Sequence, residues 1–337
     1  MQANNLYNNL YNDLYNDFLN EWSTKWFQYI LDNPNKPWNY YNLSSNLNTT
    51  WKTIKENPEI QWDYSELSKN QNITWKIVQD NHDKHWDYDI LCLNPNIKFE
   101  QLRRNLNGSR CYFWLSSNKN LKIEIFQNNR NGWWNYSSLS ENNAITWEIV
   151  QANPDKPWNH HQLSHNPNIT WEIVQANPHY EWCHIGLSKN PNITWEIIRL
   201  NPQINWNYTA LSYNPNIIWE MVKSTPQEDW DYNLLSQNSN ITWEIIQANP
   251  NKDWDYYELS KNPNISWKII QSTQNKNWDY NRLSSNQMTK EREQFIRSKF
   301  QQWFKQSNLK AELMAVVWHP INFEKFKYLD SETFGDE

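Results

Sequence analysis

Large apolar side chains recur along this chain with a period of 24 residues, in two registers. The period runs through eleven units without an insertion. The first register is Trp38, Trp62, Trp86, Arg110, Trp134, Trp158, Trp182, Trp206, Trp230, Trp254 and Trp278, and the second is Phe27, Trp51, Trp75, Phe99, Ile123, Trp147, Trp171, Trp195, Trp219, Trp243 and Trp267. A period of this size indicates units that cannot bury their own apolar faces and must stack on their neighbours.

The polar residues around these apolar positions predict two short helices in each unit. The first runs from Thr170 to about Ala176 in a typical unit, since Thr is a good N-cap and Asn177-Pro178 ends it. The second opens with an Asn or Asp cap after Pro-Trp and runs about two turns to a Leu-Ser pair. Helices this short need neighbours to be stable. We therefore predict an all-α fold, an elongated α-solenoid of eleven two-helix repeats.

One polar position is Asn in every unit, three residues after an invariant Leu. Function in a binding repeat varies between units whereas structure repeats, so we expect a buried ladder in which each amide bonds to backbone groups. The alternative is a row of amides that reads a ligand. Asn118, Asn166, Asn190 and Asn214 are assigned to the ladder, and Trp158, Trp171, Trp182 and Trp195 to the packing between units.

The two ends of the chain lie outside the periodic part. Leu and Tyr recur every four residues over positions 1–24, and Phe295, Ile296, Phe300, Trp303 and Phe304 give the other end an apolar helical face. We predict an N-terminal capping helix at 1–24, the solenoid at 25–287, and a C-terminal helical cap and tail at 288–337. The alternative for the cationic C-terminal helix is binding to an acidic partner.

Composition narrows the class of protein. Mean hydropathy is −0.99, but 24 Trp, 18 Tyr and 11 Phe supply enough apolar surface for a folded chain. Four glycines leave no phosphate-binding loop, and no Ser-His-Asp or paired-carboxylate arrangement stands out. Cys92, Cys111 and Cys183 suggest neither a metal-ligand pair nor a disulfide framework. We expect a cytoplasmic, non-enzymatic protein with no cofactor, no metal and no membrane segment.

Two families resemble this chain. The order helix, Asn-Pro, short helix with Leu-Ser, at 24-residue spacing, resembles the leucine-rich repeat variant, which pairs an α-helix with a 3₁₀-helix. The Asn-Pro-Asn-Ile-Thr-Trp-Glu-Ile segment at 190–197 and the Trp318-His319-Pro320 segment are similar to tryptophan-rich repeat proteins of giant amoeba viruses. The resemblance implies a solenoid and no particular activity. A viral origin would place the protein in the host cytoplasm, the viral factory or the virion.

The candidate binding surface is a row of acidic residues. The residue after the second-register apolar position is acidic in seven consecutive units: Glu100, Glu124, Glu148, Glu172, Glu196, Glu220 and Glu244. One interpretation is a surface for a basic protein, because like charges in a row are otherwise unfavourable. The other is that Glu in the first turn complements the helix dipole. Arg103 and Arg110 lie in the least regular unit, which is either a binding hot spot or the product of drift.

A second cluster contains His160, His161, His165, Cys183 and His184. A metal site is one interpretation, and replacement of a packing tyrosine by neutral histidine is the one we favour. The function predicted overall is a protein-interaction scaffold with an acidic and aromatic surface. The alternative is a reader of single-stranded nucleic acid that stacks one base per unit. A net charge of −6 argues against that alternative.

Overall fold

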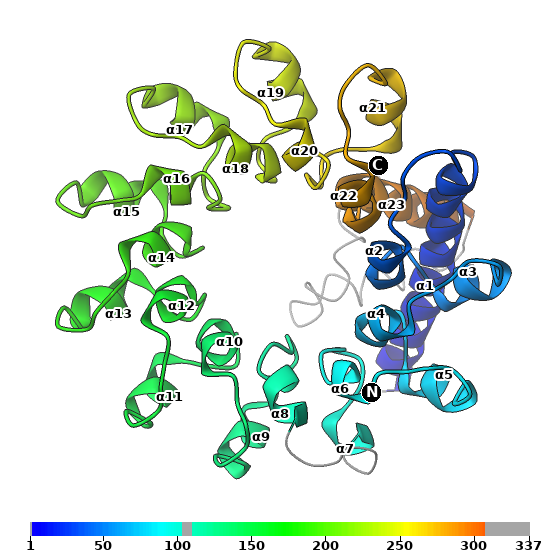
Figure 1. Cartoon of the computed structure of the whole chain (residues 1–337), viewed down its shortest axis with the longest axis horizontal. Helices are drawn as coiled ribbons and strands as arrows, with labels where there is room; N and C mark the ends of the chain where they lie inside the picture. Colours follow the sequence, from blue (N-terminus) through cyan, green and yellow to red (C-terminus); the bar gives the residue numbers. More distant parts are fainter. Residues whose placement is uncertain (1, 103–109, 307–337) are drawn as a thin grey trace.

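The computed structural model describes residues 2–102 and 110–306, and within these ranges the chain is helical with no strand (Figure 1). Each unit contributes one helix to an inner layer and one to an outer layer, as the two-helix prediction requires. The inner helices are α2 (Tyr40–Ser45), α4 (Tyr64–Lys69), α6 (Tyr88–Leu91), α8 (Arg110–Leu115), α10 (Tyr136–Glu141), α12 (His160–His165), α14 (His184–Lys189), α16 (Tyr208–Leu211), α18 (Tyr232–Gln237), α20 (Tyr256–Leu259) and α22 (Tyr280–Ser285).

The outer helices begin at the second-register apolar residue. They are α3 (Trp51–Glu56), α5 (Trp75–Asp80), α7 (Phe99–Leu102), α9 (Ile123–Asn128), α11 (Trp147–Gln151), α13 (Trp171–Ala176), α15 (Trp195–Leu200), α17 (Trp219–Ser224), α19 (Trp243–Ala248) and α21 (Trp267–Ser272). The end of α1 (Gln2–Leu31) supplies the outer helix of the first unit, since Phe27 packs on Trp62 as Trp51 packs on Trp86. The last helix is α23 (Thr289–Gln306).

The expectation of an elongated body is wrong, because the solenoid closes into a ring (Figure 1). Helix α2 packs directly against α22. Asn46 in the first unit donates to the carbonyl oxygens of Ser284 and Asn286 in the last, at 2.9 and 3.0 Å. Trp38 packs edge-on against Tyr280 with 5.0 Å between ring centroids. The first and last units therefore meet through the same contacts that join units elsewhere in the chain.

The asparagine row forms the predicted ladder. Asn166 is fully buried, and its Nδ2 donates to the carbonyl oxygens of Ser140 and Asn142 in the preceding unit at 2.8 and 3.2 Å. Its Oδ1 accepts from the Asn168 backbone N–H at 2.8 Å. Each amide thus satisfies a turn in its own unit and carbonyl groups in the unit before it. The buried members are Asn46, Asn70, Asn94, Asn118, Asn142, Asn166, Asn190, Asn214, Asn238, Asn262 and Asn286.

The serine of the Leu-Ser pair forms a second ladder between units. The Ser164 hydroxyl donates to the His160 carbonyl oxygen and accepts from the backbone N–H of Cys183 in the next unit at 2.9 Å. That N–H belongs to the residue at the N-cap position of the next inner helix. The first-register indoles bond within their own unit, as Trp158 does to the Asn153 carbonyl oxygen at 2.9 Å. At the regular junctions, neighbouring units are therefore joined by an amide, a hydroxyl and aromatic rings.

The two terminal helices lie beside the point of closure and pack on each other. Phe300 of α23 stacks on Tyr11 and packs edge-on against Phe18 of α1, with centroid distances of 5.3 and 5.0 Å. Trp22 of α1 donates to the Asn48 side-chain oxygen at 2.8 Å. The sequence predicts caps over the open ends of a solenoid, whereas these two helices lie where the ring closes; the predicted tail beyond residue 306 is outside the described residues. Instead, α1 contacts α3, α23 and, through Tyr29, the Trp267 ring of α21.

Closure predicts that the seam is as stable as any internal junction. We expect Asn46→Ala and Asn166→Ala each to lower the free energy of unfolding by about 1–3 kcal/mol, because each removes the side-chain donor to a buried serine carbonyl group in the preceding unit. Asn168→Ala is the control and should cost less, since Asn168 is half-buried and water can replace its bonds. Urea unfolding monitored by tryptophan fluorescence gives the three values. A near-zero cost for Asn46→Ala would mean that the ring is open in solution.

Candidate functional site

All seven glutamates of the predicted acidic row are exposed, each at the second residue of an outer helix. Because the units form a ring, the row follows the outer circumference as an arc rather than a straight stripe (Figure 1). We call these residues the acidic arc. The same position holds exposed Gln28, Lys52, Lys76 and Lys268 in the four remaining units. The circumference is therefore acidic over seven units and neutral or basic over the four units around the closure.

The carboxylates of the acidic arc interact with the start of their own helices. At Glu172, a hydrogen bond from the Thr170 hydroxyl and then one from its own backbone N–H hold the pKa of the carboxyl below its ordinary value. Thr170 is also the N-cap, with its side chain facing the Ile173 N–H. Glu148 and Glu244 have lowered pKa values for the same two reasons, with Thr146 and Thr242. The helix-terminus chemistry expected of this position is therefore present, and it leaves the carboxylates facing solvent.

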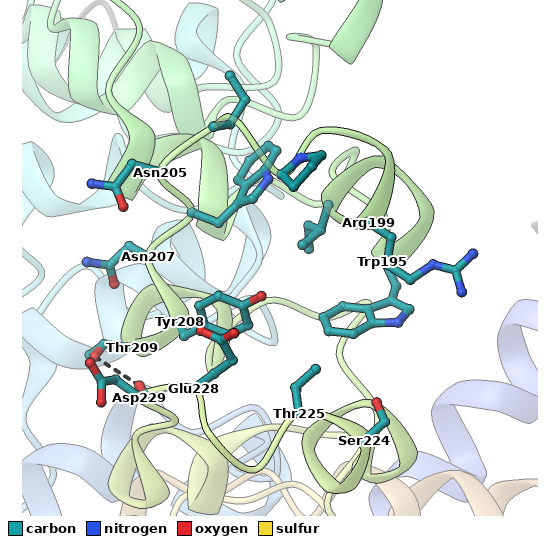
Figure 2. Close-up of a pocket in the computed structure, with 14 residues that line it drawn as sticks. Trp195, Arg199, Asn205, Asn207, Tyr208, Thr209, Ser224, Thr225, Glu228 and Asp229 are labelled. Carbon is teal, nitrogen blue, oxygen red and sulfur yellow. Dashed lines mark hydrogen bonds between the residues drawn. The ribbon is translucent and has the colours of Figure 1, made fainter.

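Among the hollows between units, two differ in whether glutamates of the acidic arc line them. One, of about 560 Å³, is lined by Glu100 and Glu124 together with the Phe99 and Tyr112 rings and Lys122. It borders the irregular unit. The other, of about 800 Å³, lies between α15 and α17 and is shown in Figure 2. The Trp195 and Tyr208 rings project into it, whereas the Arg199 guanidinium points away. The size of these hollows depends on the distance between adjacent outer helices. The 24-residue period of the sequence does not determine that distance.

The cations predicted in the irregular unit receive less support. Arg103 lies outside the residues that the structure describes. Of Arg110 the structure places only the backbone, at the start of α8. The candidate site is therefore built from the glutamates of the acidic arc and the neighbouring aromatic rings.

The tryptophan rows are used for packing between units. Trp158 is buried, whereas Trp171, Trp182 and Trp195 are half-buried against the core. Trp171 packs on Trp206 of the next unit, with 5.7 Å between centroids, and Trp195 packs on Trp230 at 6.4 Å. A protein that stacks one base per unit needs one free aromatic face in each unit. The indoles that would supply such a row are engaged with each other.

The histidine cluster contains a pair rather than a metal-binding group. Among the described residues, no set of three or more His, Cys, Asp or Glu side chains could hold a metal ion. His161 Nδ1 lies 3.0 Å from Cys183 Sγ. His160 stacks on Tyr180, with 4.7 Å between centroids and 13° between planes. His160 thus makes an aromatic contact at a position that holds tyrosine in most units, which agrees with the interpretation as a tyrosine substitute.

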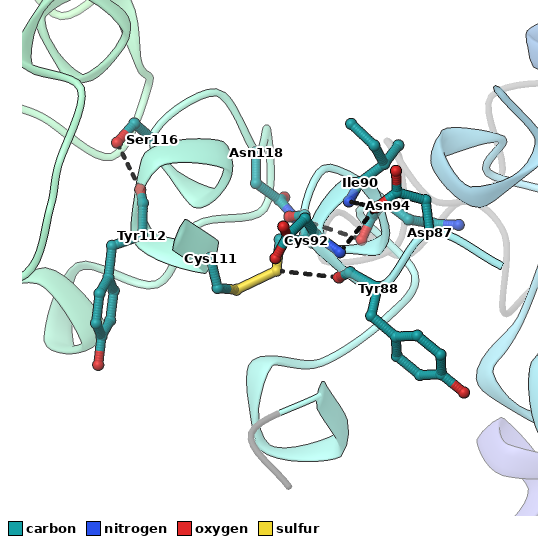
Figure 3. Close-up of a disulfide and its surroundings, with 10 residues drawn as sticks. Asp87, Tyr88, Ile90, Cys92, Asn94, Cys111, Tyr112, Ser116 and Asn118 are labelled. Atoms are coloured by element: carbon teal, nitrogen blue, oxygen red, sulfur yellow. Dashed lines mark hydrogen bonds between the residues drawn. A yellow bond between two sulfur atoms is a disulfide. The ribbon is translucent and has the colours of Figure 1, made fainter. Parts of the chain in front are cut away.

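The expectation that the cysteines form no disulfide is wrong. Cys92 and Cys111 are bonded, with their Cα atoms 5.8 Å apart (Figure 3). Cys92 follows the invariant Leu91 and so occupies the serine position of its unit. Cys111 stands where the other units have the N-cap residue of the inner helix, although α8 itself begins one residue earlier, at Arg110. Their separation of 19 residues equals that of Ser164 and its partner Cys183. The spacing of the two cysteines therefore indicates a disulfide once it is known that the serine position of one unit contacts the N-cap position of the next.

No family model, curated protein or solved structure matches the chain. The resemblance to tryptophan-rich viral repeat proteins stays a prediction. Within the described residues, no helix is both long enough and apolar enough to cross a membrane.

The threonine caps predict a measurable titration. Thr170→Ala should move the pKa of Glu172 up toward the ordinary glutamate value, because the hydroxyl that stabilises the carboxylate is gone, whereas Thr170→Ser should leave it low. In the native protein this interaction is complete at neutral pH. It is lost as the pH falls through the lowered pKa, because the stabilised form is the ionised one. Carboxyl-carbon NMR titration of Glu172 measures the shift, and equal pKa values in the alanine and serine variants would refute the assignment.

Proposed function

We propose that this protein is a non-enzymatic protein-interaction ring that presents its acidic arc, together with neighbouring aromatic rings, to a partner with a basic surface. The observation that carries the proposal is the acidic arc itself. Seven consecutive units place an exposed carboxylate at one position, whereas the units around the closure place Lys or Gln there. A preference for glutamate in the first turn of a helix would apply to every unit, so it does not explain why four units have Lys or Gln at this position.

The hollow bordered by Glu100 and Glu124 gives the proposal a specific location. Phe99 and Tyr112 pack on each other there with 5.8 Å between ring centroids, so carboxylates and aromatic faces occur together. Lysine and arginine side chains bind to both kinds of group, through ion pairs and through contact with aromatic faces. A basic segment crossing this hollow would find both.

Nucleic-acid binding is the weaker candidate. The circumference carries glutamate where a phosphate-binding protein would carry lysine or arginine, and the regular tryptophan rows are packed between units.

Charge reversal tests the proposal. We expect Glu148→Lys/Glu172→Lys/Glu196→Lys to abolish the salt-dependent capture of basic proteins in a pull-down from lysate and to leave the helical circular dichroism spectrum unchanged, since exposed charges contribute little to stability. Each reversal adds two charges, so the net charge changes from −6 to 0.

A matched control separates the position of the charges from their number. Glu59→Lys/Glu181→Lys/Asp253→Lys reverses three exposed residues off the acidic arc and reaches the same net charge. It should retain the captured partners. If both triple variants capture the same proteins as the wild type, the acidic arc is not an interface. If both lose them, only the overall charge matters.

A further inference from the structure

The serine ladder has ten rungs in a ring of eleven junctions. In each rung a serine hydroxyl accepts a hydrogen bond from the N-cap backbone N–H of the next unit, at 2.9–3.0 Å. The rung between Ser284 and Asn39 crosses the closure. The missing rung would join positions 92 and 111, where the structure has the disulfide. The covalent bond therefore stands in the one place where the hydrogen bond is absent.

The same junction lacks two other features of the repeat. The first-register tryptophan, whose indole satisfies a turn carbonyl in other units, is replaced by Arg110. The N-cap Asp or Asn, whose side chain accepts from the first turn, is replaced by Cys111. The amide contacts remain, since Asn118 donates to the Cys92 carbonyl oxygen at 2.7 Å and Asn120 donates to the Pro95 carbonyl oxygen at 3.0 Å.

Cys183 shows that a cysteine at the N-cap position does not by itself alter the junction. It occupies the same position as Cys111, but its partner is Ser164, and the rung forms at 2.9 Å. Cys183 remains a free thiol. The disulfide therefore follows from cysteine at both positions of one rung.

We propose that the Cys92–Cys111 disulfide is a redox-sensitive lock that holds the α6–α8 junction of the ring. With a dithiol reductant such as dithiothreitol, a thiolate of the reductant attacks one sulfur and forms a mixed disulfide. The second thiol of the reductant then attacks this mixed disulfide, which releases the protein sulfur as a thiol and leaves the reductant as a cyclic disulfide. The sulfur–sulfur bond of the protein accepts two electrons and two protons and becomes two thiols.

The reduced junction has a weaker rung than any other. The Cys92 sulfur lies 3.6 Å from the Tyr88 carbonyl oxygen, where a serine hydroxyl would donate (Figure 3). In the disulfide it has no proton, and reduction restores one. As an acceptor for the Cys111 N–H, however, a thiol sulfur is weak. Both cysteines are only 1% exposed, so the reductant reaches them when the junction opens.

The test compares oxidised protein, protein equilibrated with dithiothreitol, and the variant Cys92→Ser/Cys111→Asn, which restores the residues of other units. Under denaturing conditions, thiol titration should find only Cys183 free in the oxidised protein and all three cysteines free after reduction. Hydrogen exchange measured by mass spectrometry then reports each junction separately.

We expect reduction to speed amide exchange in α6 and α8 by about tenfold, which corresponds to losing roughly one hydrogen bond of protection. Exchange in α12 and α14 on another part of the ring should stay unchanged. The Cys92→Ser/Cys111→Asn variant should keep the slow exchange of the oxidised protein with or without reductant. Cys183→Asn is the control and should respond to reductant as the wild type does.

Three results would overturn the proposal. Three free thiols in protein prepared under air would show that the bond does not form. Unchanged amide exchange in α6 and α8 after complete reduction would show that the disulfide does not stabilise the junction. Exchange in the double variant as fast as in the reduced wild type would show that a serine rung does not replace the disulfide.

Discussion

The buried amide of each unit, bonded to the backbone of the unit before it, is the interaction on which the fold depends. Helices of four to six residues have no stability alone, so each unit needs a neighbour on both sides. An open solenoid leaves its first and last units with one neighbour each. The ring removes that deficit, because Asn46 finds in Ser284 and Asn286 the same acceptors that Asn166 finds in Ser140 and Asn142.

The local structure was predictable from the sequence, and the closure was not. Thr170, Asn177 and the invariant leucines mark the helices because caps and apolar spacing are local properties. The burial of Asn166 followed from its presence in every unit. Closure depends on the rotation between successive units, which is set by how side chains such as Trp171 and Trp206 pack across a junction. A period of 24 residues fits an open superhelix and a ring equally well.

Closure also changes the geometry of the acidic arc. On a straight solenoid the seven carboxylates would form a line that a rigid partner could cover. The outer helices that carry them follow a convex edge, so a flat rigid surface can reach only a few of the carboxylates at once. A flexible basic segment can follow the curve and enter the hollow at Glu100 and Glu124. Under the proposed function, the curvature of the ring therefore favours an extended chain as the partner.

The irregular unit shows that one junction of the ring can lack several of the contacts that join the other units. Drift alone would predict scattered substitutions, each weakening its own position. Here the lost serine and the lost N-cap residue are the two partners of a single rung, and both are cysteine. Cysteine at the serine position alone would leave a thiol opposite a backbone N–H, whereas cysteine at both positions allows a covalent bond in place of the hydrogen bond. The irregularity at Arg110 is therefore tolerated because the adjacent contact is covalent, and its tolerance depends on the oxidation state of that contact.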